Sequence, residues 1–131
     1  LKVASMNGDL IDAEVGLIQG NLLGSLQGKF DIIVSNPPYI QSHKIKSLEP
    51  EIGREPLIAL DGGTDGTKVI VPLLKEIQKM LKPSYSAAYV EIDPPIADIV
   101  LKTAKARFSY AEVSLLTDLL GLVRSVSIEN N

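Results

Sequence analysis

The stretch Phe30–Tyr39, with the sequence FDIIVSNPPY, decides how the rest of the chain is interpreted. Its apolar run Ile32–Val34 shows no alternation, which is typical of a parallel strand covered on both faces. Two prolines then end the strand, because proline has no N–H to donate to a neighbouring strand. The stretch therefore predicts a central strand with Asn36 at its carboxyl end, where open α/β sheets bind their ligands.

The residues after this strand suit the binding of a planar NH2 group. The side-chain oxygen of Asn36 and the carbonyl oxygen of Pro37 can each accept one of its hydrogens. Pro38 would set the shape of the turn, and Tyr39 offers a flat aromatic face for an amide or a nucleobase. Such a site would hold a nitrogen in place for an in-line displacement. The alternative interpretation of these four residues is a proline-rich turn without chemistry.

Together with the segment Glu55–Gly66, which reads EPLIALDGGTDG, this stretch resembles the HemK/PrmC family. The resemblance implies a class I, Rossmann-like methyltransferase that uses S-adenosylmethionine as its cofactor. Its substrate would be the side-chain amide of the glutamine in the Gly-Gly-Gln motif of a peptide-chain release factor. The resemblance implies that the catalytic residues are Asn36, Pro37, Pro38 and Tyr39.

Cofactor contacts are expected around the turn that precedes the first stretch. Residues 13–19 are predicted to form a strand, after which family members commonly carry an acidic residue near the adenine of the cofactor. This chain has Asn21 there, so the resemblance implies contacts of Asn21, Leu22 and Asn36 with S-adenosylmethionine. The alternative for Asn21 is an ordinary asparagine in a turn.

The segment from 40 to 63 is predicted to be a long loop that contacts substrate. The resemblance implies that Glu55–Pro56 folds back and supports the Asn36–Tyr39 turn, although Glu55 could instead cap local backbone or pair with Arg54. A glycine-rich turn would follow, with Thr64 or Asp65 as the N-cap of a helix at 69–81.

The remaining elements predict an α/β sheet, mostly parallel with an antiparallel last strand. Strands are expected at 86–92 and 110–117, and the last strand at 122–129 would return through a hairpin closed by an Asp118–Arg124 pair. Between them, Asp93 would cap a helix whose inner face is formed by Ile96, Ile99, Val100 and Ala104.

The family's first strands and glycine-rich turn have no counterpart in this sequence. Residues 1–131 are therefore expected to be a partial catalytic domain, the carboxyl-terminal two-thirds, that begins at a helix end marked by Gly8. The chain alone would bind S-adenosylmethionine weakly or not at all. The strand at 30–35 would have an open edge, available to a second copy or to an amino-terminal segment.

Composition narrows the function further. The chain has 131 residues, a formal net charge of −3 and no cysteine, so neither a basic nucleic-acid surface nor a thiolate metal site is expected. No metal and no membrane partner are predicted, and the cytoplasm is the default location, with an organelle left open. Two alternatives remain: an adenine amino-methyltransferase acting on DNA or RNA, and a non-catalytic fragment with a methyltransferase fold.

Overall fold

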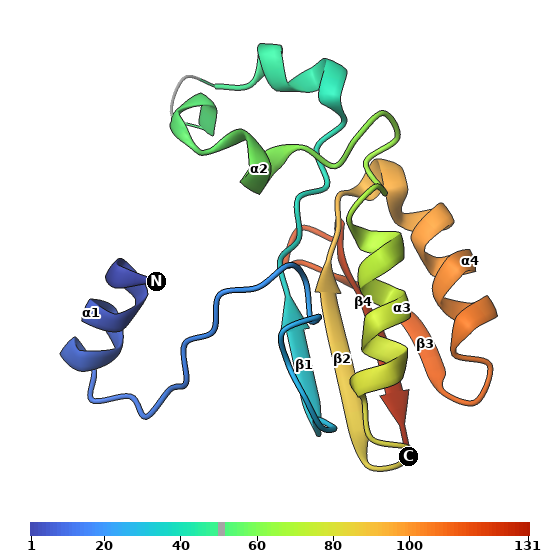
Figure 1. The fold of residues 1–131 in the computed structure, drawn as a ribbon. Helices are drawn as coiled ribbons and strands as arrows, with labels where there is room; N and C mark the ends of the chain where they lie inside the picture. The colour runs from blue at the N-terminus through green and yellow to red at the C-terminus, as the bar shows by residue number, and fades with distance from the viewer. Residues whose placement is uncertain (50–51) are drawn as a thin grey trace.

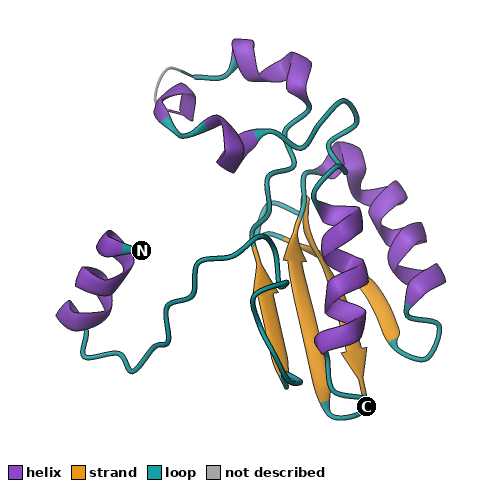
Figure 2. Cartoon of the chain, in the orientation of Figure 1, coloured by secondary structure: helices purple, strands orange, loops and turns teal. Residues whose placement is uncertain are grey.

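A four-stranded sheet with two helices on one face forms the body of the molecule (Figure 1, Figure 2). The computed structural model describes residues 1–49 and 52–131. The strand order is β1-β2-β4-β3, with β1 parallel to β2 and with β4 antiparallel to both of its neighbours. The bounds of the strands and of the two covering helices are β1 Ile32–Ser35, β2 Ser86–Glu91, β3 Glu112–Thr117, β4 Val123–Asn130, α3 Ile70–Met80 and α4 Ala97–Arg107.

The prediction of an antiparallel last strand is confirmed, but its place in the sheet was not predicted. β4 returns from β3 and lies between β2 and β3, so it forms hydrogen bonds with a strand on either side. β1, β2 and β3 therefore all run in the same direction, and the carboxyl ends of all three lie at the same edge of the sheet.

The core lies between the sheet and the two helices. The predicted helical period in α3 is confirmed, because Ile70, Leu74 and Ile77 are fully buried. In α4 the prediction was wrong for Ile99, whose side chain is 47% exposed, and Ala97 is buried instead. The apolar side chains that the sheet buries beneath these helices are Ile33, Ala88, Val90, Val113, Val126 and Ile128.

The opposite face of β1 is uncovered, which corrects the prediction of a strand buried on both sides. Ile33 is buried, but Ile32 is 65% exposed and Val34 is 75% exposed. Successive side chains of a strand point to opposite faces, and the helices α3 and α4 cover only one of them. β1 also lies at the edge of the sheet, as predicted.

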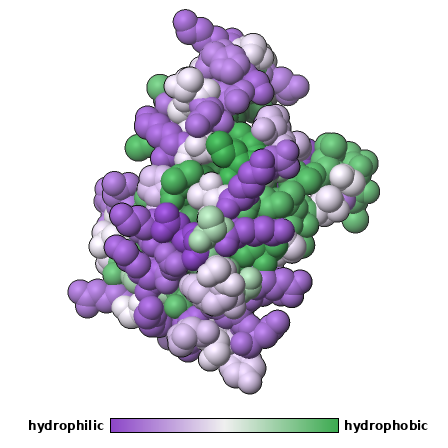
Figure 3. Space-filling model, turned by 90° about the vertical axis from the view of Figure 1, so that its right-hand side faces the viewer, coloured by the Kyte–Doolittle hydropathy of each residue, from purple (hydrophilic) through white to green (hydrophobic). Residues whose placement is uncertain are grey.

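Exposed apolar side chains also occur elsewhere on the molecule. Figure 3 shows hydrophobic patches between hydrophilic regions on the face that it presents. The turn between β3 and β4 contributes two of the most exposed apolar side chains, Leu119 and Leu120. None of the helices in the described part of the chain is long and apolar enough to cross a membrane.

The amino-terminal segment differs from the prediction. α1 (Lys2–Leu10) continues through Gly8 and buries none of its side chains. Residues 13–19, predicted as a strand, form no regular secondary structure and run as an extended connection between α1 and the sheet (Figure 1). The physical reason is that a strand needs a paired neighbour, and none of the described strands pairs with these residues.

The predicted loop at 40–63 contains short helical turns. These are η1 (Ser42–Ser47), η2 (Ile52–Arg54) and α2 (Leu57–Leu60), which are too short for an apolar period to reveal them in the sequence. Positions 50 and 51 of the predicted loop lie outside the described residues.

Of the predicted helix caps, Thr64 or Asp65 was wrong for α3, whereas the N-cap position of Asp93 is confirmed. α3 has Val69 at its N-cap position, because the carboxylate of Asp65 accepts hydrogen bonds from Thr67 instead of capping the helix. Asp93 precedes η3 (Pro94–Ile96), the turn that leads into α4, but it makes no side-chain capping bond.

Candidate active site

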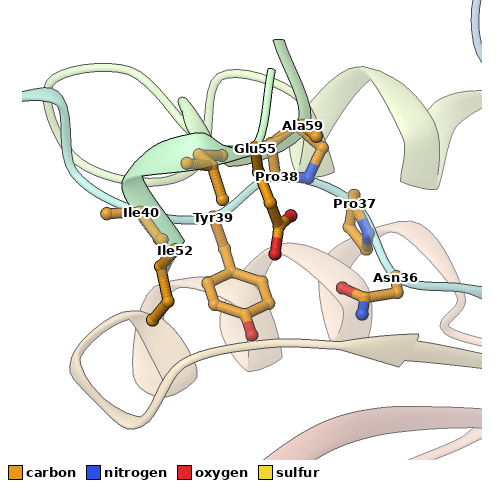
Figure 4. Close-up of a pocket in the computed structure, with 9 residues that line it drawn as sticks. Asn36, Pro37, Pro38, Tyr39, Ile40, Ile52, Glu55 and Ala59 are labelled. Atoms are coloured by element: carbon orange, nitrogen blue, oxygen red, sulfur yellow. The ribbon is translucent and has the colours of Figure 1, made fainter. Parts of the chain in front are cut away.

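The candidate site begins where β1 ends and the chain leaves the sheet (Figure 4). Asn36 is exposed, Pro37 is buried, and Pro38 and Tyr39 are half-buried. Within the described part of the chain, the Asn36 amide makes no hydrogen bond and no backbone N–H donates to the Pro37 carbonyl. The structure thus brings the four predicted catalytic residues together with two hydrogen-bond acceptors available.

Two cavities meet at Asn36. The first, of about 250 Å3, is lined by the whole Asn36–Tyr39 turn and by Ile52, Glu55 and Leu60. The second, of about 460 Å3, is lined by Val34, Tyr89, Glu91 and Arg124. A flat group bound against the Asn36 side chain could therefore be part of a larger molecule that extends into both.

Tyr39 is tied to the neighbouring strand. Its hydroxyl donates a 2.7 Å hydrogen bond to Oε1 of Glu91, the last residue of β2. Burial, together with the nearby Glu91 carboxylate, raises the pKa of Tyr39 to about 12. The phenol is therefore neutral at physiological pH, and the hydrogen bond holds the Tyr39 ring in the lining of the first cavity. Glu91 had no predicted role, although it lies at the carboxyl end of β2, next to the carboxyl end of β1 where Asn36 lies.

The backbone of the turn rests directly on two glycines of the glycine-rich segment. A Cβ atom added to Gly62 would lie 2.6 Å from the carbonyl carbon of Tyr39, and one added to Gly66 would lie 2.6 Å from the carbonyl oxygen of Tyr39. Hydrogen bonds join the same two segments, since the N–H of Ile40 donates to Leu60 and that of Gly62 donates to Ile40. The close backbone contacts thus come from Gly62 and Gly66, and the support of the turn by Glu55–Pro56 stays a prediction.

Glu55 lies in the first cavity. Figure 4 shows its carboxylate pointing into the space between Tyr39 and Asn36. The Glu55 side chain forms no hydrogen bond or ion pair with any described residue. It therefore neither caps the local backbone nor pairs with Arg54, the two predicted alternatives.

Asn21 and Leu22 belong to the turn that precedes β1 along the chain. Neither is among the residues that line the two cavities at Asn36. Their turn is fixed to α3 by the N–H of Leu23, which donates a 2.8 Å hydrogen bond to Glu76, and Leu22 packs against the core. Their contact with a cofactor stays a prediction.

Asp118 lines the second cavity and organises the hairpin turn between β3 and β4. The predicted pair is confirmed, since Nε of Arg124 lies 3.0 Å from Oδ2 of Asp118. The other carboxylate oxygen accepts from the N–H groups of Leu120 and Leu122. The hydrogen bond from Arg124 and those from the two N–H groups hold the pKa of Asp118 below its usual value.

This carboxylate is expected to make stability depend on pH. The folded-state pKa of Asp118 is depressed, so its contribution is present above the unfolded-state value of about 3.9 and is lost as pH falls through the folded-state value. Asp118→Asn should therefore lower the melting temperature at pH 7 and change it less near pH 3. Asp9→Asn, which removes an exposed carboxylate of α1, is the control, and an equal shift at both pH values would contradict the expectation.

Comparison with known proteins identifies methyltransferases. A family model described as the Eco57I restriction-modification methylase matches residues 4–67, which include the Asn36–Tyr39 turn. The release factor glutamine methyltransferase of Deinococcus radiodurans is 35% identical over 126 residues, covering 96% of this chain and 44% of the relative. That of Bacillus subtilis is 37% identical over 135 residues, covering 96% and 45%. The chain spans less than half the length of these curated relatives.

Solved structures with the same fold are also methyltransferases. The ribosomal protein L11 methylase of Lactobacillus delbrueckii subsp. bulgaricus has a TM-score of 0.65 at 15% identity, with 99% of this chain and 52% of that one covered. The E. cuniculi Mtq2-Trm112 complex, described as methylating the eRF1 termination factor, has a TM-score of 0.61 at 21% identity, covering 93% and 66%.

These likenesses agree with the site. The sheet has the class I, Rossmann-like methyltransferase fold predicted from the sequence. The Asn36–Tyr39 turn lies at the carboxyl end of a strand in that fold. The segment Glu55–Gly66, which also resembles the family, packs against this turn. The chain therefore belongs to the HemK/PrmC family of methyltransferases.

Proposed function

We propose that residues 1–131 are part of a catalytic domain that methylates the side-chain amide of the glutamine in the Gly-Gly-Gln motif of a peptide-chain release factor. The observation that carries the proposal is the exposed Asn36 carboxamide at the end of β1, in one cavity with the Tyr39 ring. The names of the relatives support the choice of substrate. The proposed location is the cytoplasm, where translation takes place in bacteria.

The four residues of the turn divide the work of holding the amide. The Asn36 side-chain oxygen and the Pro37 carbonyl oxygen accept the two N–H hydrogens, which fixes the plane of the amide and therefore the direction of the nitrogen lone pair, perpendicular to that plane. Pro38 restricts the backbone so that these two acceptors keep their spacing. Tyr39 supplies an uncharged aromatic surface for the plane of the amide, consistent with its raised pKa of about 12.

The proposed methyl donor is S-adenosylmethionine, and the described residues fit part of its site. The Asn36 side chain is exposed, and Asn21 presents an exposed carboxamide that can donate to and accept from an adenine edge, with Leu22 beside it. When bound, this cofactor would supply an electrophilic methyl group to the amide nitrogen and leave as S-adenosylhomocysteine, while one N–H proton would be released to water. The role of the Asn36–Tyr39 turn is to hold that nitrogen within reach of the methyl group.

A second candidate is methylation of the adenine amino group in nucleic acid. The match of residues 4–67 to a restriction-modification methylase favours this candidate. The adenine amino group is a planar NH2, like that of the glutamine amide, so the oxygens of Asn36 and Pro37 could accept its two hydrogens as well. The net charge of −3 opposes it, since proteins that grip nucleic acid carry basic surfaces.

A competition between substrates tests the proposal. The full-length protein is incubated with labelled S-adenosylmethionine and either a release factor or an adenine-containing duplex. We expect methyl transfer to the release factor and none to the duplex. A release factor whose Gly-Gly-Gln glutamine is replaced by glutamate is the control and should stay unlabelled. Transfer to adenine alone would reverse the ranking of the two candidates.

A further inference from the structure

We infer that Glu91 is a positioning residue that holds the Tyr39 ring in the geometry needed for methyl transfer. This inference rests on the proposed function and adds a residue that lies outside the Asn36–Tyr39 turn. Glu91 ends β2, the strand beside β1, so it reaches the site from a different part of the chain.

The contact that carries the inference joins the turn to the rigid sheet. The Tyr39 hydroxyl donates to Oε1 of Glu91 at 2.7 Å, across 52 positions of sequence. The opposite end of the Tyr39 residue is held by Gly62 and Gly66, which touch its backbone. The residue is thus fixed at its backbone and at its hydroxyl, and the ring between them can turn or tilt little.

The hydrogen bond also joins a residue of one cavity to a residue of the other. Tyr39 lines the first cavity and Glu91 lines the second, and Asn36 lines both. Losing the bond would free the ring to move toward the second cavity and would change the surface against which the amide lies. The cost would fall on the orientation of the bound substrate, since a small misplacement of the reacting atoms slows a reaction strongly.

Other charged groups near the Tyr39 hydroxyl belong to the same end of the sheet. Asp93 and the Glu91 carboxylate raise the pKa of Tyr39, and Arg124 lowers it, while burial makes the largest contribution. Arg124 can only donate, and Asp93 forms no hydrogen bond with Tyr39, so among these charged groups Glu91 is the one that accepts the phenol hydrogen.

The chain contains a matched control for this pair. Tyr89, also on β2, donates from its hydroxyl to Oε1 of Glu129 at 3.4 Å. Glu129 lines neither of the cavities at Asn36. Tyr89 itself lines the second cavity, so Glu129→Ala breaks a second tyrosine–glutamate contact there while leaving the Tyr39–Glu91 bond and the lining of the first cavity in place.

The test compares Glu91→Ala, Glu91→Gln, Tyr39→Phe and Glu129→Ala in the full-length protein labelled with 13C at the tyrosine hydroxyl carbon. In the wild type, the Tyr39 signal, assigned by its loss in Tyr39→Phe, should start to titrate only well above pH 10, the usual tyrosine range. In Glu91→Ala it should titrate earlier. Glu129→Ala should leave the Tyr39 signal unchanged.

Turnover gives the second readout. Glu91→Ala should lower kcat roughly 10- to 100-fold and leave the affinity for S-adenosylmethionine unchanged. Glu91→Gln should retain kcat within about threefold, because the glutamine oxygen still accepts the phenol hydrogen. If Glu91→Ala does not fold, Tyr39→Phe decides, because it removes the same bond from the other side and should reproduce the loss in kcat.

The inference is overturned if Glu91→Ala turns over like the wild type or if its Tyr39 signal titrates like that of the wild type. It is also overturned if Glu91→Gln is as slow as Glu91→Ala, which would assign Glu91 a role through its charge. If the proposed function is wrong, the wild-type enzyme will not methylate a release factor, which is a different result from those above. Turnover is then measured on the acceptor that it does methylate, and the titration is unaffected.

Discussion

Asn36→Ala is expected to lower kcat of the full-length enzyme while changing its affinity for S-adenosylmethionine far less. The side-chain oxygen of Asn36 is proposed to hold one hydrogen of the acceptor amide, a bond that matters most as the nitrogen attacks. Removing one positioned hydrogen bond of this kind costs about 2–4 kcal/mol of transition-state stabilisation, or roughly 30- to 1,000-fold in rate. Single-turnover kinetics with a release factor would measure the loss, and equilibrium dialysis would measure cofactor affinity.

The structure supplies the control for this experiment. Asn131 is exposed beside the amino end of β1, where it lines a separate cavity with Asp31 and Ile32. Asn131→Ala makes the same chemical change at the other end of the strand and should leave both kcat and cofactor affinity unchanged. Wild-type turnover in Asn36→Ala would remove Asn36 from the proposed mechanism.

Gly66→Ala should destabilise the fold more than the same change at any glycine that has free space around it. Gly66 has a φ of +82°, and an added Cβ would lie 2.6 Å from the Tyr39 carbonyl oxygen and 3.0 Å from Cγ2 of Ile96. The left-handed backbone costs an L-residue about 1–2 kcal/mol, and overpacking adds roughly 1–3 kcal/mol. The free energy of unfolding should therefore fall by about 2–5 kcal/mol.

Gly121 separates these two contributions. It has nearly the same conformation, with a φ of +78°, but an added Cβ would meet nothing within 4 Å. Gly121→Ala should therefore cost only the backbone part, about 1–2 kcal/mol. Urea unfolding of the two variants gives the difference, and equal losses would show that the contact with Tyr39 is not tight. Gly66→Ala should also lower kcat, because the Tyr39 backbone must move.

Much of this protein could be predicted from sequence because its signals are local. The prolines after β1 end the strand whatever surrounds it, so the place of Asn36 at the carboxyl end follows directly. The apolar period of α3 specifies which of its side chains are buried. The Asp118–Arg124 pair was also predictable, since the two residues flank one short turn.

Where the prediction was wrong, the missing information was a partner. Residues 13–19 have the composition of a strand but form none, because no described strand pairs with them. The apolar run predicted Val34 to be a core residue, but its side chain is 75% exposed. The reason is that the helices of this chain cover only the other face of the sheet. A local pattern shows that a residue is apolar, but burial depends on what packs against it.

The sequence by itself determined the strand, the turn after it and the type of group that the turn can hold. Only the tertiary structure showed that Glu91 accepts a hydrogen bond from the Tyr39 hydroxyl and that Gly62 and Gly66 pack closely against the Tyr39 backbone. These contacts join positions 23 to 52 residues apart, and they exist because parallel β1 and β2 end side by side beneath the glycine-rich turn. Hydrogen bonds and close packing act across space, so chain spacing carries no record of them.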